Sequence, residues 1–512
     1  MLPMLNGMFA FAIWDSPRRR LLIARDHFGI KPLYYARLPH GLLFGSELKS
    51  LLRHPSFDST PDPDSLADFF NLSYIPREGS PIRAARKLLP GHYLLADEGS
   101  FHIKPWYDLA EQKSPYWSTL NGQKEELEHL FDDSLRLQMR SDVPVASFLS
   151  GGLDSSLIAT TAARFSQIQV QTYNVTFADT PFDEGPYARM VSESIPSDHR
   201  VIHASSLDAI QKLPRLIWHL DEPNGDGAMI GTYLVSELAA RDVRVCLSGL
   251  GGDELFGGYE RYKPKSIGRV RKIFKHVPAF AGALTPLAGR IAPQWASELR
   301  LASDPSQDWF EYYKHLLVFD DCVLQNMSFP GHSGAEGIFR DLWARYPGDD
   351  TVGRLQFIDQ HTYLPDQILA LTDRMSMANS LEVRVPFLDF RLAQFAAGIP
   401  GVFKETSSNY KIFLKQALGN RLPQEILDRP KWGFGSPIRE WLMYPDLQRI
   451  VRRLPDLLAD WFSPASIRQL TKTPEAVSRR FHRVWCLLVF AIWLRVYRCS
   501  TPPIVSLNEL LE

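Results

Sequence analysis

The feature that most constrains this sequence is a glycine-rich turn between an apolar segment, residues 143–149, and a helical pattern over residues 155–165. The turn consists of Ser150, Gly151, Gly152, Leu153, Asp154 and Ser155. Adjacent glycines let the backbone adopt positive φ and approach a ligand, while the first helical N–H groups and the serine hydroxyls point at an anion. The turn therefore predicts a phosphate site, with a tight turn without ligand as the alternative. No lysine follows as in the GxxxxGK[ST] loop, so cleavage between β- and γ-phosphates is not indicated.

A second glycine-rich loop follows another short apolar strand, predicted over residues 244–247, and extends to Tyr259. Its glycines leave room for a bulky ligand, and Asp253 with Glu254 can hold Mg²⁺ through one or two oxygens while phosphates complete the octahedron. Asp154 of the first turn is the natural partner of Asp253. An acidic surface loop is the alternative for this segment alone, but the two loops together favour a nucleotide.

The pattern of elements predicts a sheet domain followed by an α/β domain. Short strands separated by turns are expected at residues 8–14, 21–25, 33–36, 42–45 and 92–96. A polar stretch, residues 111–123, is the linker candidate. Beyond it a helix at 125–137 and strands at 143–149 and 170–177 alternate with helical segments, which is the rhythm of a parallel sheet with helical crossovers. From about residue 307 onward helical periodicity dominates.

Composition excludes several classes of protein. A net charge of −1 over 512 residues provides no field that would draw the chain onto nucleic acid or an anionic membrane. The cysteines form no C-x-x-C pair, which fits a reducing cytoplasm; they are Cys246, Cys322, Cys486 and Cys499. The longest apolar run, residues 486–494, is too short to span a bilayer and predicts a buried helix. We therefore expect a cytoplasmic protein with small-molecule partners.

A cluster of basic residues follows the second loop: Arg261, Lys263, Lys265, Arg269, Arg271, Lys272 and Lys275. It can be interpreted as an RNA-binding patch or as a solvated helix face. Overall neutrality and helical spacing favour the solvated face.

The two loops resemble the pyrophosphate loop and the metal loop of the asparagine synthetase family. The resemblance continues in Asp221-Glu222-Pro223 and in segments 373–378 (DRMSMA), 382–389 (EVRVPFLD) and 431–435 (KWGFG). Segments 5–12, 25–35 and 46–49 are similar to the second half of that family's glutaminase domain. The resemblance thus covers nearly the whole chain.

The resemblance implies a fold of two domains. Residues 1–110 would form a partial, mainly β glutamine amidotransferase domain of the N-terminal-nucleophile type, and residues 111–123 the linker. Residues 124–512 would form an α/β synthetase domain of the ATP-pyrophosphatase (adenine nucleotide α-hydrolase-like) type, with a parallel sheet and a helical C-terminal part.

The resemblance also implies a nucleotide and a metal site. Leu149 and Val175 match positions that line the adenosine pocket, and Ser248 with Gly249 match backbone contacts to the nucleotide. The turn at 150–155 would hold the phosphates of ATP. Asp154 and Asp253 match the Mg²⁺ carboxylates.

Three further residues are candidates for the catalytic step. Lys431 matches a lysine that holds pyrophosphate, with a solvated loop lysine as the alternative. Arg374 matches a basic residue near the phosphates, with an ion pair to Glu382 or Asp373 as the alternative. Glu382 is the third candidate, although it and Arg384 can equally pair with each other or with Asp389.

The implied reaction activates a carboxylate, most simply that of aspartate. The carboxylate attacks the α-phosphorus of ATP, giving an acyl-adenylate and pyrophosphate, and an amine then displaces AMP. Two other functions stay open: amide or lactam closure on a peptide or natural product, and a catalytically silent nucleotide-binding protein. A homodimer also stays open.

The sequence departs from the family pattern at two places. The family's glutaminase uses an N-terminal cysteine, whereas the first cysteine here is Cys246 and the first strand begins almost at residue 1. We therefore expect no glutamine hydrolysis by this polypeptide and nitrogen from ammonia, an amine or a separate glutaminase chain. Leu250 replaces a glutamate of the aspartate-specific members, which leaves the acid substrate open.

Overall fold

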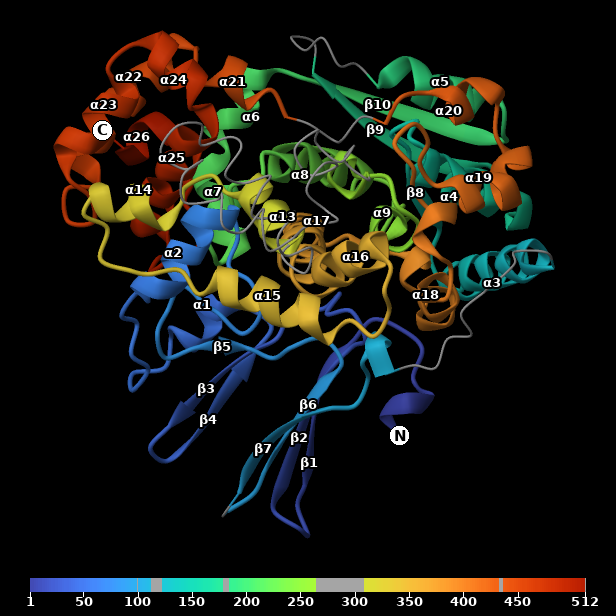
Figure 1. Ribbon diagram of the computed structural model, residues 1–512, viewed down its shortest axis with the longest axis horizontal. Helices are drawn as coiled ribbons and strands as arrows, with labels where there is room; N and C mark the ends of the chain where they lie inside the picture. Colours follow the sequence, from blue (N-terminus) through green and yellow to red (C-terminus); the bar gives the residue numbers. More distant parts are fainter. Residues whose placement is uncertain (99, 112–121, 178–183, 264–307, 432–435, 512) are drawn as a thin grey trace, which may run out of the picture.

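The computed structural model describes residues 1–98, 100–111, 122–177, 184–263, 308–431 and 436–511 (Figure 1). Most of the expected linker (112–121), the basic residues beyond Lys263 in the cluster and residues 432–435 of the KWGFG segment lie outside the described residues.

The N-terminal part is built from two antiparallel sheets, which form the lower part of the molecule in Figure 1. One has the order β1 (Ala10–Asp15), β2 (Arg20–Arg25), β6 (His92–Ala96) and β7 (Phe101–Pro105). The other has the order β4 (Gly41–Gly45), β3 (Tyr34–Leu38) and β5 (Arg86–Lys87). The five expected strands are confirmed, and β5 and β7 were not predicted. The helices α1 (Leu48–Leu51) and α2 (Pro63–Leu72) connect this part to the rest.

The second part contains a five-stranded parallel sheet, as the alternating pattern predicts. Its order is β10 (Ser197–Ala204), β9 (Val170–Phe177), β8 (Val145–Phe148), β11 (Val245–Leu247) and β12 (Glu382–Arg384). Helix α3 (Gln123–Gln138) precedes the first strand of this sheet, and the crossover helices are α4 (Leu153–Phe165), α5 (Gly185–Glu193), α6 (Ser206–Gln211), α7 (Leu213–Leu220) and α8 (Ala228–Ala239). Because β8 and β11 are parallel neighbours, the two glycine-rich loops leave the same edge of the sheet side by side.

Helices make up most of the remaining described chain. In order they are α9 (Gly252–Phe256), α13 (Asp308–Leu316), α14 (Asp321–Asn326), α15 (Ala335–Arg345), α16 (Thr351–His361), the π-helical turn η5 (Leu364–Leu369), α17 (Ala370–Met377), α18 (Phe390–Ala397), α19 (Ile412–Leu418), α20 (Gln424–Asp428), α21 (Ile438–Trp441), α22 (Pro445–Leu457), α23 (Pro464–Thr471), α24 (Pro474–Arg479), α25 (Phe481–Val496) and α26 (Leu507–Leu511).

The apolar run at 486–494 lies in α25, which is buried nearly all round and forms part of the main core, as expected. None of the described helices combines the length and the apolarity that crossing a bilayer requires.

A buried ionic contact joins the N-terminal sheets to the helices of the second part. Asp221, at the end of α7, accepts hydrogen bonds from the backbone N–H groups of Leu48 and Lys49 at 3.0 and 3.2 Å. The ammonium of Lys49 lies 2.7 Å from the same carboxylate, and the guanidinium of Arg374 lies 3.1 Å from it. The buried carboxylate of Asp221 is tolerated because two backbone N–H groups, an ammonium and a guanidinium surround it.

Candidate active site

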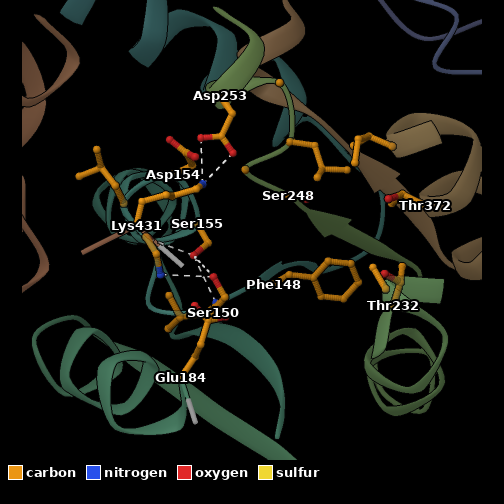
Figure 2. Close-up of a pocket in the computed structure, with 18 of the residues that line it drawn as sticks. Phe148, Ser150, Asp154, Ser155, Glu184, Thr232, Ser248, Asp253, Thr372 and Lys431 are labelled. Carbon is orange, nitrogen blue, oxygen red and sulfur yellow. Dashed lines mark hydrogen bonds and ion pairs between the residues drawn. The ribbon is translucent and has the colours of Figure 1, made fainter. Parts of the chain in front are cut away.

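A cavity of about 420 Å³ opens at the carboxyl ends of β8, β9 and β11 (Figure 2). Both glycine-rich loops line it, together with residues from α8, α17 and the chain around α19. Its lining includes these residues expected from the sequence: Leu149, Ser150, Gly152, Asp154, Ser155, Val175, Ser248, Gly249, Asp253 and Lys431. The edge of a parallel sheet beyond its strands is where nucleotides bind in such folds.

Hydrogen bonds and close packing hold the first loop in shape. The hydroxyls of Ser150 and Ser155 lie 3.0 Å apart, and the Ser155 hydroxyl donates to the carbonyl of Gly152 at 3.2 Å. Gly151 has φ +73°, and a Cβ there would lie 2.5 Å from the backbone nitrogen of Ala188, so only glycine fits. The loop is thereby closed tightly before α4, whose N-terminus faces the cavity as an anion site requires.

The two loops contact each other directly at Asp154. A Cβ on Gly249 would lie 2.8 Å from the Cβ of Asp154, and one on Gly252 would lie 2.7 Å from its carboxylate. The glycines of the second loop therefore make space for the carboxylate of the first, a contact that spacing along the chain does not reveal.

Two lysines and two carboxylates form a charged cluster at this contact. The ammonium of Lys411 lies 2.6 Å from Asp253 and also pairs with Asp154, and the ammonium of Lys431 lies 2.7 Å from Asp253. Burial by itself would raise the pKa of Asp253, but Lys411 and Lys431 outweigh it and lower this pKa to about 2. Burial opposes the charge of Lys411, yet Asp154 and Asp253 raise its pKa. Asp253 and Lys411 are therefore charged at neutral pH, whereas burial raises the pKa of Asp154 against the opposing effect of Lys411.

The cluster suits a magnesium ion. Asp154 and Asp253 share one ammonium, so their carboxylates lie close together, and Oδ1 of Asp154 is buried without a hydrogen-bond partner among the described residues. In the described part of the chain, no group of three or more His, Cys, Asp and Glu is arranged so that it could hold a metal ion. Mg²⁺ does not need one, because one or two carboxylates with phosphates and water fill its coordination sphere.

Three lining residues near the first loop escaped the sequence analysis, Lys411, Arg429 and Glu184. Lys411 precedes α19 in a left-handed backbone conformation, with φ +50°. Arg429 donates to the carbonyl of Gly151 at 2.9 Å and pairs with Glu184 at 2.5 Å. No glycine-rich or acidic motif surrounds Lys411 or Arg429 in the sequence, and Glu184 follows no recognisable pattern, so local signals could not have found them.

The opposite wall of the cavity has a different character. Figure 2 shows Lys431, Ser150 and Glu184 at one end and Thr232 and Thr372 at the other. The lining of the cavity also contains apolar, aromatic and acidic side chains, which are Leu250, Ile368, Leu371, Tyr259, Tyr363 and Glu254. The Tyr259 hydroxyl donates to Glu254 at 2.7 Å. Burial, with the nearby Asp253 charge, raises the pKa of Glu254 to about 7.

Two of the three expected catalytic residues lie elsewhere. Arg374 does not line the cavity; it is 5 % exposed and pairs with Asp221, not with the expected alternatives Glu382 or Asp373. Glu382 begins β12, at the amino end of a strand whose carboxyl end faces the cavity, and it pairs with Arg384 at 2.6 Å. The alternative of a Glu382–Arg384 pair is confirmed.

The basic cluster after the second loop was expected to form a solvated helix face, and this prediction is wrong for its first residue, Arg261. Arg261 is largely buried: its guanidinium pairs with Asp359 at 2.7 Å and stacks over the rings of Tyr259 and Tyr363 at 4.1 and 4.3 Å. Asp359 also accepts from the hydroxyls of Tyr262 and Tyr312. Arg261 thus packs against Tyr259 and Tyr363, which line the cavity, and its guanidinium is engaged by Asp359 instead of facing solvent freely.

Comparison with known proteins agrees with this geometry. Residues 126–495 match the model of the asparagine synthase family, and residues 1–107 match that of a glutamine amidotransferase domain. The chain is 31 % identical over 500 residues to asparagine synthetase [glutamine-hydrolyzing] 1 of Bacillus subtilis, with 96 % of this chain and 77 % of that protein covered. It is 33 % identical over 513 residues to a putative asparagine synthetase [glutamine-hydrolyzing] of Mycobacterium bovis, with the same coverage.

More distant relatives include a protein with a different name. Amidase chry2 of Gibberella zeae is 25 % identical over 492 residues, covering 85 % of this chain and 70 % of that protein. The match of the family model to most of the chain, and of the two synthetases to nearly all of it, is decisive. This chain belongs to the asparagine synthase family of ATP-dependent carbon–nitrogen ligases.

Proposed function

We propose that this chain binds ATP with Mg²⁺ in the cavity and uses it to activate a carboxylic acid as an acyl-adenylate, with release of pyrophosphate. The observation that most supports this proposal is the cluster of Lys411, Lys431, Asp154 and Asp253 beside the first loop. Two ammonium groups next to two potential Mg²⁺ ligands suit a leaving group that carries several negative charges.

In this proposal each part of the cavity has one task. The N–H groups at the start of α4 and the hydroxyls of Ser150 and Ser155 hold phosphate oxygens. Leu149, Val175, Ser248 and Gly249 enclose the nucleoside. Mg²⁺ held by Asp154 and Asp253 would neutralise charge on the phosphates. Lys411 and Lys431 stabilise the charge that builds on the departing pyrophosphate, and their fixed positions lower the cost of reorganisation.

Aspartate is the simplest acid substrate, and asparagine the corresponding product. Leu250 favours a second candidate, because its apolar side chain lines the cavity and cannot bind or transfer a proton. Amidation or lactam closure of a larger acid would use the same activation chemistry. A catalytically silent nucleotide-binding protein would have no need for two carboxylates and two lysines in this arrangement.

We further propose that ammonia or an amine is the nitrogen donor of the 512-residue chain. Attack on the glutamine carboxamide needs a positioned nucleophile and a base. The four cysteines lie in the second part, where Cys246 and Cys486 are buried and Cys322 and Cys499 are partly or fully exposed. A separate glutaminase chain is the other source of nitrogen compatible with this arrangement.

The activation step is tested by its nucleotide products. The purified chain is incubated with ATP, Mg²⁺ and single candidate acids, beginning with aspartate, and AMP, ADP and pyrophosphate are quantified. Acid-dependent formation of equal amounts of AMP and pyrophosphate is the expected result. ADP as the product, or no acid-dependent turnover with any acid tested, would contradict the proposal.

A further inference from the structure

A second hollow, an open groove of about 720 Å³, lies on the outer side of the phosphate end of the cavity. The two hollows share a wall made of Tyr410, Arg429, Pro430 and Lys431. The wall is held from within, because the Tyr410 hydroxyl donates to the carbonyl of Arg429 at 2.8 Å. The groove therefore adjoins the part of the cavity where the phosphates are expected.

The groove contains charged side chains of both signs, with Glu260 and Asp428 as its carboxylates and Lys263 and Lys415 among its cations. Lys263 and Glu260, at 2.5 Å, neutralise each other. Lys415 is different: its ammonium lies 3.8 Å from the centre of the Tyr410 ring, and none of the described carboxylates lies within ion-pair distance of it. Lys415 follows Lys411 by one turn of α19, so it stands next to the charged cluster but outside it.

The position of the groove relative to the cavity indicates which reactant or product would reach it. In phosphoryl transfer the attacking and leaving oxygens lie roughly in line on opposite sides of the phosphorus. Lys431 lies at one end of the cavity in Figure 2, and Thr232 and Thr372 lie at the other. If the leaving pyrophosphate faces Lys411 and Lys431, the acid must approach from the far end. The groove beyond Lys431 is thus on the side of the leaving group.

We propose that this groove binds inorganic pyrophosphate as it leaves the cavity, with Lys415 as the next cation after Lys431. The proposal rests on the proposed function, since it takes pyrophosphate as the product. Three features support it: the shared wall, the open and polar groove, and a lysine that stacks on the aromatic side of that wall without a carboxylate partner. Lys415 acts here as a binding residue for the product and has no part in the chemical step.

The test measures equilibrium binding, so that it does not depend on turnover. Inorganic pyrophosphate with Mg²⁺ is titrated into the full chain by calorimetry. Lys415→Gln should raise the dissociation constant for pyrophosphate about fivefold at low salt, as expected for the loss of one partly exposed charged contact. The difference from the wild type should shrink as added salt screens the charge. Lys415→Arg should bind as the wild type does. Lys472→Gln, which removes an exposed lysine beside α23 on the other side of the molecule, is the matched control.

Binding of ATP with Mg²⁺ distinguishes the groove from the cavity. Lys415→Gln should leave the dissociation constant for ATP within about twofold of the wild type, because the proposal places Lys415 outside the ATP site. Equal pyrophosphate affinity in the wild type and Lys415→Gln, or an equal loss for ATP and pyrophosphate, overturns the proposal. Should the wild type form no AMP while the selective pyrophosphate effect is present, the proposed function fails and the groove stands.

Discussion

The ammonium nitrogen of Lys431 lies 2.7 Å from Oδ2 of Asp253, although 178 positions separate the two residues in the chain. Lys411 approaches the same carboxylate at 2.6 Å and is almost completely buried. Both lysines thus stand where a polyphosphate bound to Asp253 through Mg²⁺ would meet them. In the proposed reaction this arrangement would gather the charges that stabilise a leaving pyrophosphate before any ligand binds, which is the preorganisation that electrostatic catalysis requires.

Replacing Asp154 tests the metal assignment. Asp154→Asn should lower acid-dependent pyrophosphate release about 100-fold, because it removes one of two carboxylates that position Mg²⁺ against the phosphates. The amide has nearly the shape of the carboxylate, so the far-ultraviolet circular dichroism should not change. Asp341→Asn, at an exposed position on α15, serves as the control. Pyrophosphate release by Asp154→Asn at nearly the wild-type rate would remove Asp154 from the site.

Replacing Arg374 separates a structural from a catalytic role. Arg374→Met leaves the buried carboxylate of Asp221 without one of its charged partners, and we expect the free energy of unfolding to fall by about 3 kcal/mol. The KM for ATP of the folded enzyme should stay unchanged, because Arg374 does not line the cavity.

The measurements for Arg374 are urea unfolding and steady-state kinetics, both compared with Arg340→Met, which removes an exposed arginine of α15. A variant with wild-type stability and a much raised KM for ATP would place Arg374 beside the phosphates after all.

Because of Lys404, the free energy of unfolding should change with pH in the alkaline range. It is buried, and its ammonium donates to Gln356 at 2.9 Å. Burial lowers the pKa of Lys404 to about 8, against a small opposing effect of Asp350. Between about pH 8 and pH 10 the unfolded chain therefore binds a proton that the folded chain does not, and the free energy of unfolding rises with pH.

Lys404→Met should remove that rise. At pH 7 the variant should be more stable than the wild type by about 2 kcal/mol, which is the cost of the buried charge less the lost hydrogen bond to Gln356. Near pH 10 the difference should vanish or reverse. Urea unfolding at several pH values is the measurement, with Lys104→Met on β7 as an exposed control. A constant difference between the variant and the wild type would show that Lys404 keeps its ordinary pKa.

The nitrogen donor can be tested on the same preparation. With ATP, Mg²⁺ and an acid that supports AMP formation, the 512-residue chain should form amide from ammonium and show no gain from glutamine at the same nitrogen concentration. Amide and glutamate are quantified by amino-acid analysis. Glutamate release coupled to amide formation from glutamine alone would overturn the expectation. Activity with glutamine only after adding a separate glutaminase would support a two-chain system.

Local patterns were sufficient for the elements and for the two loops. Strand β9 was predicted with its observed bounds, and the glycine-rich turn at 150–155 was placed before α4, because periodicity and glycine act over a few residues. The sequence suggested Asp154 and Asp253 as metal partners, but it did not predict the pairing of β8 with β11 that brings the two loops together. Strand β12 was not predicted, because two of its three residues, Glu382 and Arg384, are charged and it has no apolar run such as that of β11.

The charged residues near the first loop show what the sequence could not predict. By itself the sequence determined that the chain has two glycine-rich loops, one of them acidic, and a parallel sheet to hold them, since these depend on backbone freedom and on hydrophobic spacing. Only the tertiary structure decided that Lys411 and Arg429 line the candidate site and that Arg374 lies outside it, paired with Asp221. The physical reason is that a charged side chain has no local preference for its partner: its position is set by which carboxylate the folded chain brings within reach and by how deeply burial strengthens the pair.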